Sequence, residues 1–269
     1  MKRTLYARFS VFTICMLFLS AGFVPQLLSA QGWIKNYGIP GKNWQGTEVE
    51  KLADGGYIIG GQTAGYHNAL IARLNEEGDT LWTKLFPGTN PFGQMWLQDM
   101  ETDANGVTHA VLFNLDGWWI SYVRVDLSGN VLAEFLVYPT TIGEYLVSMS
   151  LLDDGIVFAG AISETDSTLL IKKSFNGDLI WTSSLPTMGG VVEVQQDADG
   201  NFILLVEVDD YDYEIVKADP NGQFLWRVWA PGDIYRGSIA VSPMAGSYMR
   251  PIIVSITPSS CYRYRPMAR

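Results

Sequence analysis

A unit of 45 to 50 residues recurs along this chain and constrains the fold more than any other feature of the sequence. Four segments share an acidic residue, a glycine and a run of residues typical of β-strands: DGGYIIGGQT, DANGVTHAVLF, DDGIVFAGAIS and DADGNFILLVE. Their alignable glycines, Gly56, Gly106, Gly155 and Gly200, lie 50, 49 and 45 residues apart. A repeat of this length is a small group of elements that buries its apolar faces only by stacking on its neighbours. The sequence therefore predicts a repeat fold.

A second signature follows each of these segments and contains another glycine. It reads LNEEGDTLWTKLF, VDLSGNVLAEFLVY, KSFNGDLIWTSSL and ADPNGQFLWRVWA. Trp82, Trp181 and Trp226 stand four residues after the glycine, whereas the second copy has Ala133 there. Glycines after Asp, Asn or Ser between apolar runs are typical of tight hairpins, because glycine tolerates the positive φ that these turns require. A phosphate-binding loop would need a single copy, a following Lys-Ser/Thr and a helix.

Each unit contains four short runs of strand type, and many are apolar at both odd and even positions, as in FILLVEV at 202–208. Such strands are expected to be buried on both faces, and no helical period is present after residue 30. Four-stranded units packed face to face predict an all-β fold, a β-propeller. The units span 39–86, 87–138, 139–185 and 186–230, and the recurrent Trp is expected on the outermost strand, between neighbouring blades.

A partial fifth unit spans 231–269. It contains strand-type runs at Gly237–Pro243, Pro251–Thr257 and Cys261–Pro266 but no outermost strand, while WIKNYG at Trp33–Gly38 mirrors WTKLFPG at Trp82–Gly88. We expect five blades, with the N-terminal strand 33–38 completing the last blade and removing exposed sheet edges. A truncated larger propeller is the alternative, because the tail CYRYRPMAR is unlike the repeats.

Residues 1–30 have the order of a secretory signal peptide: a basic start, a short apolar run and a small-residue exit. We place cleavage after Ala30, which leaves 31–269 as a single domain. The apolar run contains Pro25 and is marginal as a membrane span. The mature protein is therefore expected to be secreted or at the cell surface, with the periplasm as a further option, and not to be held in a membrane.

The net charge limits the kinds of ligand that the protein can bind, and the cysteine count limits its covalent cross-links. The chain has a net charge of −10, and removal of Lys2, Arg3 and Arg8 takes it to −13, which argues against nucleic acid as a ligand. One cysteine, Cys261, remains after cleavage, so no internal disulfide can form. We expect a monomer without a cofactor. Calcium stays open because EVDDYDYE at 207–214 crowds acids together, although a solvated loop is favoured there.

The pattern DGGYIIGGQT…ALIARLNEEGDTLWTKLF resembles the repeats of secreted Bacteroidota β-propeller proteins, whose units read roughly DGGY-apolar-Gly-Thr and then Lys-x-Asp-x-Gly-Asn-x-x-Trp. The resemblance runs from Trp33 to Ala230 and implies secretion and a propeller fold without implying a particular activity. Such proteins often end in a sorting domain for type IX secretion. No such domain is found in this sequence, so the resemblance leaves the route of export open.

The longer loops of the expected propeller, which join second to third strands and one blade to the next, are the predicted binding face. They carry aromatic rings beside carboxylates, a combination that suits a sugar. The candidate ligand-binding residues are Tyr66, His67, Trp96, Asp116, Trp118, Asp209, Asp210, Tyr211, Asp212 and Tyr235. The alternative is that several of these rings pack between blades.

The leading functional hypothesis is a secreted, non-enzymatic protein that binds a glycan or a cell-surface protein through this loop-rich face. The sequence has no Gly-x-Ser-x-Gly, HExxH or paired-cysteine motif, so no catalytic residue is assigned. A carbohydrate-active hydrolase or lyase is the second hypothesis, with loop carboxylates such as Asp116 and Asp210 as its acid and base. A truncated repeat protein without an independent function is the third.

Overall fold

The computed structural model describes residues 35, 37, 44–63, 67–88, 93–115, 119–137, 145–162, 167–187, 189–209, 212–230, 237–240 and 252–255. The chain divides into Met1–Lys35 and Asn36–Arg269, and every strand belongs to the second unit. All regular elements in the described ranges are β-strands. These ranges therefore contain no helix long and apolar enough to cross a membrane.

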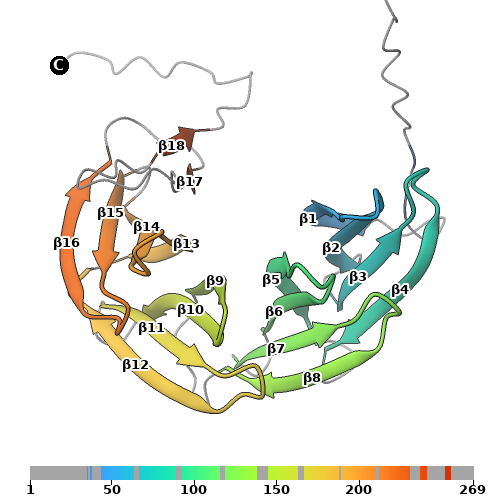
Figure 1. Ribbon diagram of the computed structural model, residues 1–269, viewed down its shortest axis with the longest axis horizontal. Helices are drawn as coiled ribbons and strands as arrows, with labels where there is room; N and C mark the ends of the chain where they lie inside the picture. The colour runs from blue at the N-terminus through green and yellow to red at the C-terminus, as the bar shows by residue number, and fades with distance from the viewer. Residues whose placement is uncertain are drawn as a thin grey trace, which may run out of the picture. The chain divides into compact units, whose positions relative to one another are not determined.

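Sixteen of the strands form four sheets, each an antiparallel meander in which consecutive strands are neighbours (Figure 1). The first sheet contains β1 (Trp44–Lys51), β2 (Tyr57–Thr63), β3 (Asn68–Leu74) and β4 (Thr80–Pro87). The second contains β5 (Met95–Thr102), β6 (Thr108–Asn114), β7 (Trp119–Val125) and β8 (Val131–Leu136). The third contains β9 (Tyr145–Leu152), β10 (Gly155–Ile162), β11 (Ser167–Lys173) and β12 (Leu179–Leu185), and the fourth β13 (Gly190–Gln196), β14 (Phe202–Asp209), β15 (Asp212–Ala218) and β16 (Phe224–Trp229).

Middle strands are buried on both faces, as their sequences predict. In β6, Ala110 and Leu112 belong to the core between the first and second sheets, whereas Val111 and Phe113 belong to the core between the second and third. In the same way, side chains of the third and fourth sheets form one shared core. The other face of the fourth sheet packs against Ile239, which follows that sheet in the chain. Each sheet thus covers the apolar face of the next, and the architecture is a β-propeller of four-stranded blades.

Two further strands, β17 (Gly237–Ala240) and β18 (Ile252–Ser255), pair antiparallel and follow the fourth sheet. They correspond to the first two runs predicted for the fifth unit, and the third run at 261–266 lies outside the described residues. The N-terminal strand predicted at 33–38 also lies outside them, except for Lys35 and Tyr37. The Tyr37 hydroxyl donates a hydrogen bond of 2.8 Å to the Gly78 carbonyl, in the β3–β4 turn.

The turn glycines confirm the hairpin interpretation at most positions and correct it at two. Gly106 and Gly200 have φ of 78° and 83°, as predicted for these turns. In the first turn Gly55, not Gly56, has the positive φ, and Gly155 has none and begins β10. A Cβ at Gly56 would lie 2.4 Å from the Leu74 carbonyl oxygen, and one at Gly155 2.2 Å from that of Lys173. At these two positions the lack of a side chain is required for close strand approach, not for backbone conformation.

The recurrent aromatic residue of the outermost strand packs on the next sheet, as expected. Trp82 of β4 lies against the Gly129 turn, where its Nε1 donates to the Leu127 carbonyl at 2.9 Å. Trp181 of β12 covers the Gly222 turn in the same way. In the second sheet, where Ala133 replaces the tryptophan, Phe135 lies against Gly177. Because residues two apart on a strand share a face, Phe135 reaches the same place.

Candidate functional site

The first strand of each sheet carries polar residues at two alternating positions. We call β1, β5, β9 and β13 the inner strands. The inner-strand residues Glu48, Asp99, Ser148 and Glu193 occupy one equivalent position, because each pairs with the corresponding residue of the second strand: Gly60, Val111, Ala159 and Leu205. Two residues further along each inner strand stand Glu50, Glu101, Ser150 and Gln195. Alternation on a strand places both positions on the same face.

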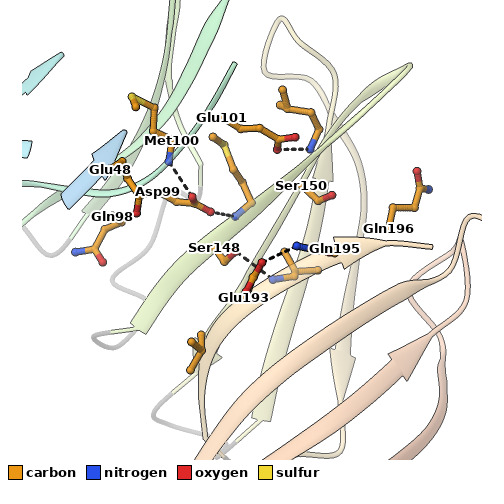
Figure 2. A pocket seen from close by; sticks show the side chains of 14 residues that line it. Glu48, Gln98, Asp99, Met100, Glu101, Ser148, Ser150, Glu193, Gln195 and Gln196 are labelled. Carbon is orange, nitrogen blue, oxygen red and sulfur yellow. Dashed lines mark hydrogen bonds between the residues drawn. The ribbon is translucent and has the colours of Figure 1, made fainter. Parts of the chain in front are cut away.

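All of these residues except Glu50 line a cavity of about 710 Å³ between the inner strands (Figure 2). Four of its lining residues are carboxylic acids, Glu48, Asp99, Glu101 and Glu193, and amides and hydroxyls supply most of the other polar groups. The described residues that line it include no Lys, Arg, His or aromatic side chain. The cavity is of the size typical of small-molecule sites, although it is more polar than most.

Most of the polar side chains at these positions also join one sheet to the next through a hydrogen bond to the main chain. In each bond a backbone N–H of one inner strand donates to a side-chain oxygen of the preceding one, and Figure 2 shows three of them as dashed lines. The five are Thr102 N to Glu50 Oε2 (2.8 Å), Met149 N to Asp99 Oδ2 (2.7 Å), Leu151 N to Glu101 Oε2 (3.1 Å), Val194 N to Ser148 Oγ (3.1 Å) and Ile239 N to Glu193 Oε2 (2.8 Å).

We call these five hydrogen bonds between neighbouring inner strands the ladder, and the ladder has a simple physical cause. Each inner strand is the edge of its sheet, so alternate N–H groups point away from the second strand and need an acceptor. A carboxylate is a stronger acceptor for such a group than a neutral side chain. The acids of the inner strands therefore have a structural role, and their presence in the cavity is not by itself evidence of chemistry.

Glu48 differs from its equivalents in this respect. Asp99 reaches Met149 N on the following inner strand, but Met100 N, the corresponding partner for Glu48, donates instead to Asp99 Oδ1 at 2.8 Å. Within the described part of the chain, the half-buried Glu48 carboxyl therefore makes no bond of the ladder. It is the acid of the cavity that is most available to a ligand.

Burial and the charges of neighbouring acids raise the pKa values of Glu48, Asp99 and Glu101. Burial, followed by the charges of Asp99, Glu50 and Glu193, raises the pKa of Glu48 to about 7. Burial also raises the pKa of Glu101 to about 7 and that of Asp99 to about 6, although backbone hydrogen bonds oppose the shift in both. The pKa of Glu50 is raised by burial as well, against its bonds to Thr102. Part of this cluster is consequently protonated near neutral pH.

The loop residues predicted from the sequence are only partly placed. Tyr66, Asp116, Trp118, Asp210, Tyr211 and Tyr235 lie outside the described residues, as does the side chain of Asp209. His67 is exposed directly before β3, with its Nδ1 3.4 Å from the Gly93 carbonyl oxygen, and Asp212 is exposed at the start of β15. Trp96 is half-buried and packs edge-on against Phe113, with ring centroids 6.2 Å apart. Trp96 thus packs against the core between the second and third sheets, and its role in ligand binding stays a prediction.

The acid-rich segments do not assemble a calcium site in the described residues. Asp197 of DADGN accepts hydrogen bonds from Asp199 N and Asn201 N and forms an ion pair with Lys217 at 2.8 Å. Glu214 of EVDDYDYE is buried and lies 3.5 Å from Arg227. No group of three or more His, Cys, Asp or Glu side chains among the described residues could hold a metal ion. Calcium therefore remains an untested expectation without a described site.

His109, which the sequence places inside a strand, is a buried structural residue. Its Nδ1 lies 2.5 Å from the Tyr122 hydroxyl and its Nε2 3.6 Å from Asp103 Oδ2. Burial lowers the pKa of His109 to about 4, against the opposing effect of the Asp103 charge. The imidazole is thus neutral at physiological pH and fills the core.

The inner-strand acids were missed by sequence reasoning, which looked for binding residues in loops. The signal was present in TEVEK at 47–51 and QDMET at 98–102, where acids alternate with apolar residues. Alternation of this kind indicates a strand with one polar face. That four such faces meet around one cavity follows only from the stacking of the sheets.

Among known proteins, similarity to this chain is found only in comparisons with solved structures. No protein-family model and no curated protein sequence matches the chain. A protein of unknown function from Bacteroides caccae is 13% identical, over 72% of this chain and 69% of that chain, with a TM-score of 0.47. The Pan2 WD40 domain of Neurospora crassa is 12% identical, over 78% and 61%, with a TM-score of 0.49. Puromycin hydrolase is 14% identical, over 78% and 33%, with a TM-score of 0.43.

The chain therefore spans less than two thirds of the Pan2 domain and about one third of puromycin hydrolase. At these identities the similarity concerns the fold alone. The assignment to the propeller class rests on the strand order within each sheet and the cores shared between sheets.

Proposed function

We propose that this protein is a secreted, non-enzymatic binding protein whose ligand enters the cavity between the inner strands and carries positive charge. The observation that supports the proposal is the lining: four carboxylic acids without a basic side chain among the described residues. Burial and, after it, repulsion by neighbouring acids raise the pKa of Glu48, and a cationic ligand would relieve that repulsion. A neutral sugar would find hydrogen-bond partners in the cavity but no aromatic ring on which to stack.

A titration experiment tests this proposal. Spermidine, a neutral cello-oligosaccharide and citrate would be titrated into the mature protein by calorimetry at about pH 8, where most of the acids are ionised. Spermidine should bind, more tightly at about pH 8 than at about pH 5.5, and citrate should not. Glu48→Gln should weaken spermidine binding roughly tenfold, the equivalent of about 1.4 kcal/mol. Glu134→Gln, an exposed acid of β8, is the matched control and should leave binding unchanged.

Recognition of a glycan or a cell-surface protein by the loops is the second binding mode that we propose, and the exposed His67 and Asp212 support it. In the same titrations, this mode predicts binding of the oligosaccharide with no effect of Glu48→Gln and a loss in a His67→Ala, Asp212→Ala double variant. That pattern would contradict the cavity as the site and leave the loop face as the binding surface.

Catalysis is the alternative favoured by one specific observation, the carboxyl groups with pKa values of about 6 and 7 in one cavity. Perturbed acids of this kind occur in hydrolases, where one carboxyl donates a proton and another acts as base or nucleophile. Release of reducing ends from a panel of polysaccharides measures such an activity. Turnover that is abolished in Glu48→Gln but retained in Glu134→Gln would replace the binding proposal with an enzymatic one.

Export is part of the proposal and rests on the first thirty residues. We expect the protein in the extracellular or periplasmic fraction to begin at Gln31. N-terminal sequencing of the protein recovered from each fraction measures this, and a mature N-terminus that retains Met1 would contradict it.

A further inference from the structure

The fourth sheet carries an exposed tryptophan that does not belong to the repeat. Trp229 of β16 is 59% exposed, whereas the repeated tryptophan of this sheet is Trp226, which holds the position of Trp82 and Trp181. Residues three apart on a strand point to opposite faces, so Trp229 lies on the other face of the sheet from Trp226. Tryptophan is mostly buried in folded proteins, and an indole exposed to this extent indicates a surface that contacts another molecule.

The register shows which residues stand at the same place in the other sheets. Trp229 pairs with Glu214 of β15, and Glu214 is buried. The equivalent pairs of third and fourth strands are Leu70 with Leu85, Ser121 with Leu136, and Leu169 with Ser184. The fourth sheet alone among the four has an acid and an aromatic ring at this pair. A buried carboxyl group in such a position costs free energy unless it has a partner.

Arg227 is that partner, and it is a third departure from the repeat. It lies two residues before Trp229 on the same face, and its side chain is 47% exposed. Its Nη1 lies 3.5 Å from Glu214 Oε2 and donates to the Pro186 carbonyl, directly after β12, at 2.9 Å. These two acceptors hold the guanidinium on the face of β16 that carries Trp229. The equivalent residues of the other sheets are Thr83, Glu134 and Thr182.

We propose that Trp229 and Arg227 form a binding site for a neutral glycan on the outermost strand of the fourth sheet. The apolar face of a pyranose ring can stack on the indole, while the guanidinium donates hydrogen bonds to the sugar hydroxyls. Glu214 is a positioning residue, which orients Arg227 from below and does not touch the sugar. A neutral glycan fits better than an acidic one, because Glu214 offsets the charge of Arg227 and the chain carries a net charge of −10.

This glycan site is distinct from the cavity between the inner strands. The described residues that line the cavity do not include Glu214, Arg227 or Trp229. The inference is therefore independent of the ligand that the cavity binds. Asp212 lies two residues before Glu214 on the same face of β15, so a substitution of Asp212 does not separate the glycan site from recognition by the loops. His67, which precedes a strand of the first sheet, does separate the two.

Calorimetric titration of the mature protein with cello-, xylo-, manno- and malto-oligosaccharides tests the proposal. At least one of these sugars should bind, and Trp229→Ala should weaken its binding by about tenfold or more, as expected for an aromatic anchor. Trp229→Phe keeps a stacking surface and should retain most of the affinity. Leu85→Ala is the matched control, because Leu85 is the equivalent residue of β4 and is 45% exposed, and it should leave binding unchanged.

Two results of these titrations would overturn the proposal. One is the absence of binding for all four sugars, and the other is equal binding by the wild type and Trp229→Ala. A loss of binding in His67→Ala without a loss in Trp229→Ala would place the sugar on the loops. Glu48→Gln should have no effect on sugar binding, so failure of the cavity proposal and failure of this one are observed separately.

The positioning role of Glu214 is tested by a double-mutant cycle with Arg227. Glu214→Gln and Arg227→Gln should each weaken sugar binding, and the double variant should lose little more than Arg227→Gln alone, since Glu214 acts through Arg227. Circular dichroism and urea midpoints establish that each variant is folded. Additive losses would contradict the positioning role. If Glu214→Gln does not fold, unchanged sugar binding in Arg227→Gln, which alters a half-exposed residue, would contradict the role of the guanidinium.

A second copy of the chain is the other occupant that an exposed indole could attract. Light scattering of the wild type and of Trp229→Ala over a range of concentrations measures this, and both proteins should be monomers. A wild-type dimer that dissociates in Trp229→Ala would assign Trp229 to self-association and would overturn the glycan site.

Discussion

At the scale of single residues, the chain uses its acids in two opposite ways. Aspartates in the hairpin turns accept backbone N–H groups, as Asp126 does from Ser128 and Asn130 at 2.8 Å. Hydrogen bonds to Asn130 lower the pKa of Asp126, so ionisation of this acid is favoured by folding. Burial and the charges of neighbouring acids raise the pKa values of Glu48, Asp99 and Glu101 on the inner strands, so folding favours their protonated forms. The two groups therefore contribute to stability in different pH ranges.

The pH dependence of stability follows from these shifts. An acid whose pKa is raised on folding stabilises the protein below its unfolded pKa, and this contribution is lost as pH rises through the folded value. For Glu48 and Glu101 that range extends from 4.5 to about 7. The free energy of unfolding should fall as pH rises from about 5 to about 8, and it should also fall below about 4, where the turn aspartates become protonated. Urea titrations across this range measure both limbs.

Removal of the Glu48 carboxylate should make the protein less sensitive to high pH. Glu48→Gln eliminates one repelling charge, so the variant should gain on the order of 1 kcal/mol relative to the wild type at about pH 8 and little at about pH 5. Urea midpoints at the two pH values provide the measurement. An equal effect at both would mean that Glu48 acts through packing and not through charge.

At the scale of elements, the sheets are joined by edge-strand hydrogen bonds and by outermost aromatic residues. The first device satisfies main-chain groups that would otherwise be unpaired, and the second fills the space between neighbouring sheets. Both recur with the repeat, so a change at one sheet has a matched counterpart at another. This periodicity supplies internal controls for mutational experiments.

The ladder predicts a graded response at Asp99. Asp99→Ala removes the acceptor for Met149 N and for Met100 N, and an unsatisfied buried N–H costs about 1–3 kcal/mol. Asp99→Asn keeps one carbonyl oxygen and removes the charge, so its loss of stability should be smaller. Chemical denaturation of the two variants measures the difference. If Ala and Asn are equivalent, the hydrogen bond between sheets is not what Asp99 supplies.

Alanine substitutions at two glycines with similar backbone conformations test the contact between an outermost strand and the turn that it covers. Gly222 and Gly200 have φ of 77° and 83°, so alanine at either position carries the cost of an unfavourable backbone conformation. A Cβ at Gly222 would also lie 2.7 Å from the Trp181 ring, whereas at Gly200 the first neighbour is 3.6 Å away. Gly222→Ala should lower Tm several degrees further than Gly200→Ala. An equal decrease in Tm for the two variants would show that the contact with Trp181 does not contribute to stability.

At the scale of the whole molecule, neighbouring sheets share cores, so no sheet is expected to unfold alone. Residues of one strand face two cores, as β6 does, and loss of one sheet would expose apolar surface on both of its neighbours. We expect tryptophan fluorescence and far-UV circular dichroism to report one coincident unfolding transition. Separate transitions would indicate that the repeats are energetically independent, as in a solenoid, and would favour a repeat fragment without an independent function.

The repeat period, the four strands of each unit and the hairpin turns were all predictable from the sequence, because they depend on local features: alternating apolar runs and glycines after Asp or Asn. The position of the aromatic residue on the outermost strand was predictable for the same reason. The candidate site was not. Glu48, Asp99, Glu101 and Glu193 are far apart in the chain, and each alone looks like an ordinary polar position of a strand. Only the stacking of the sheets brings them around one cavity, where loss of water and mutual repulsion change their chemistry.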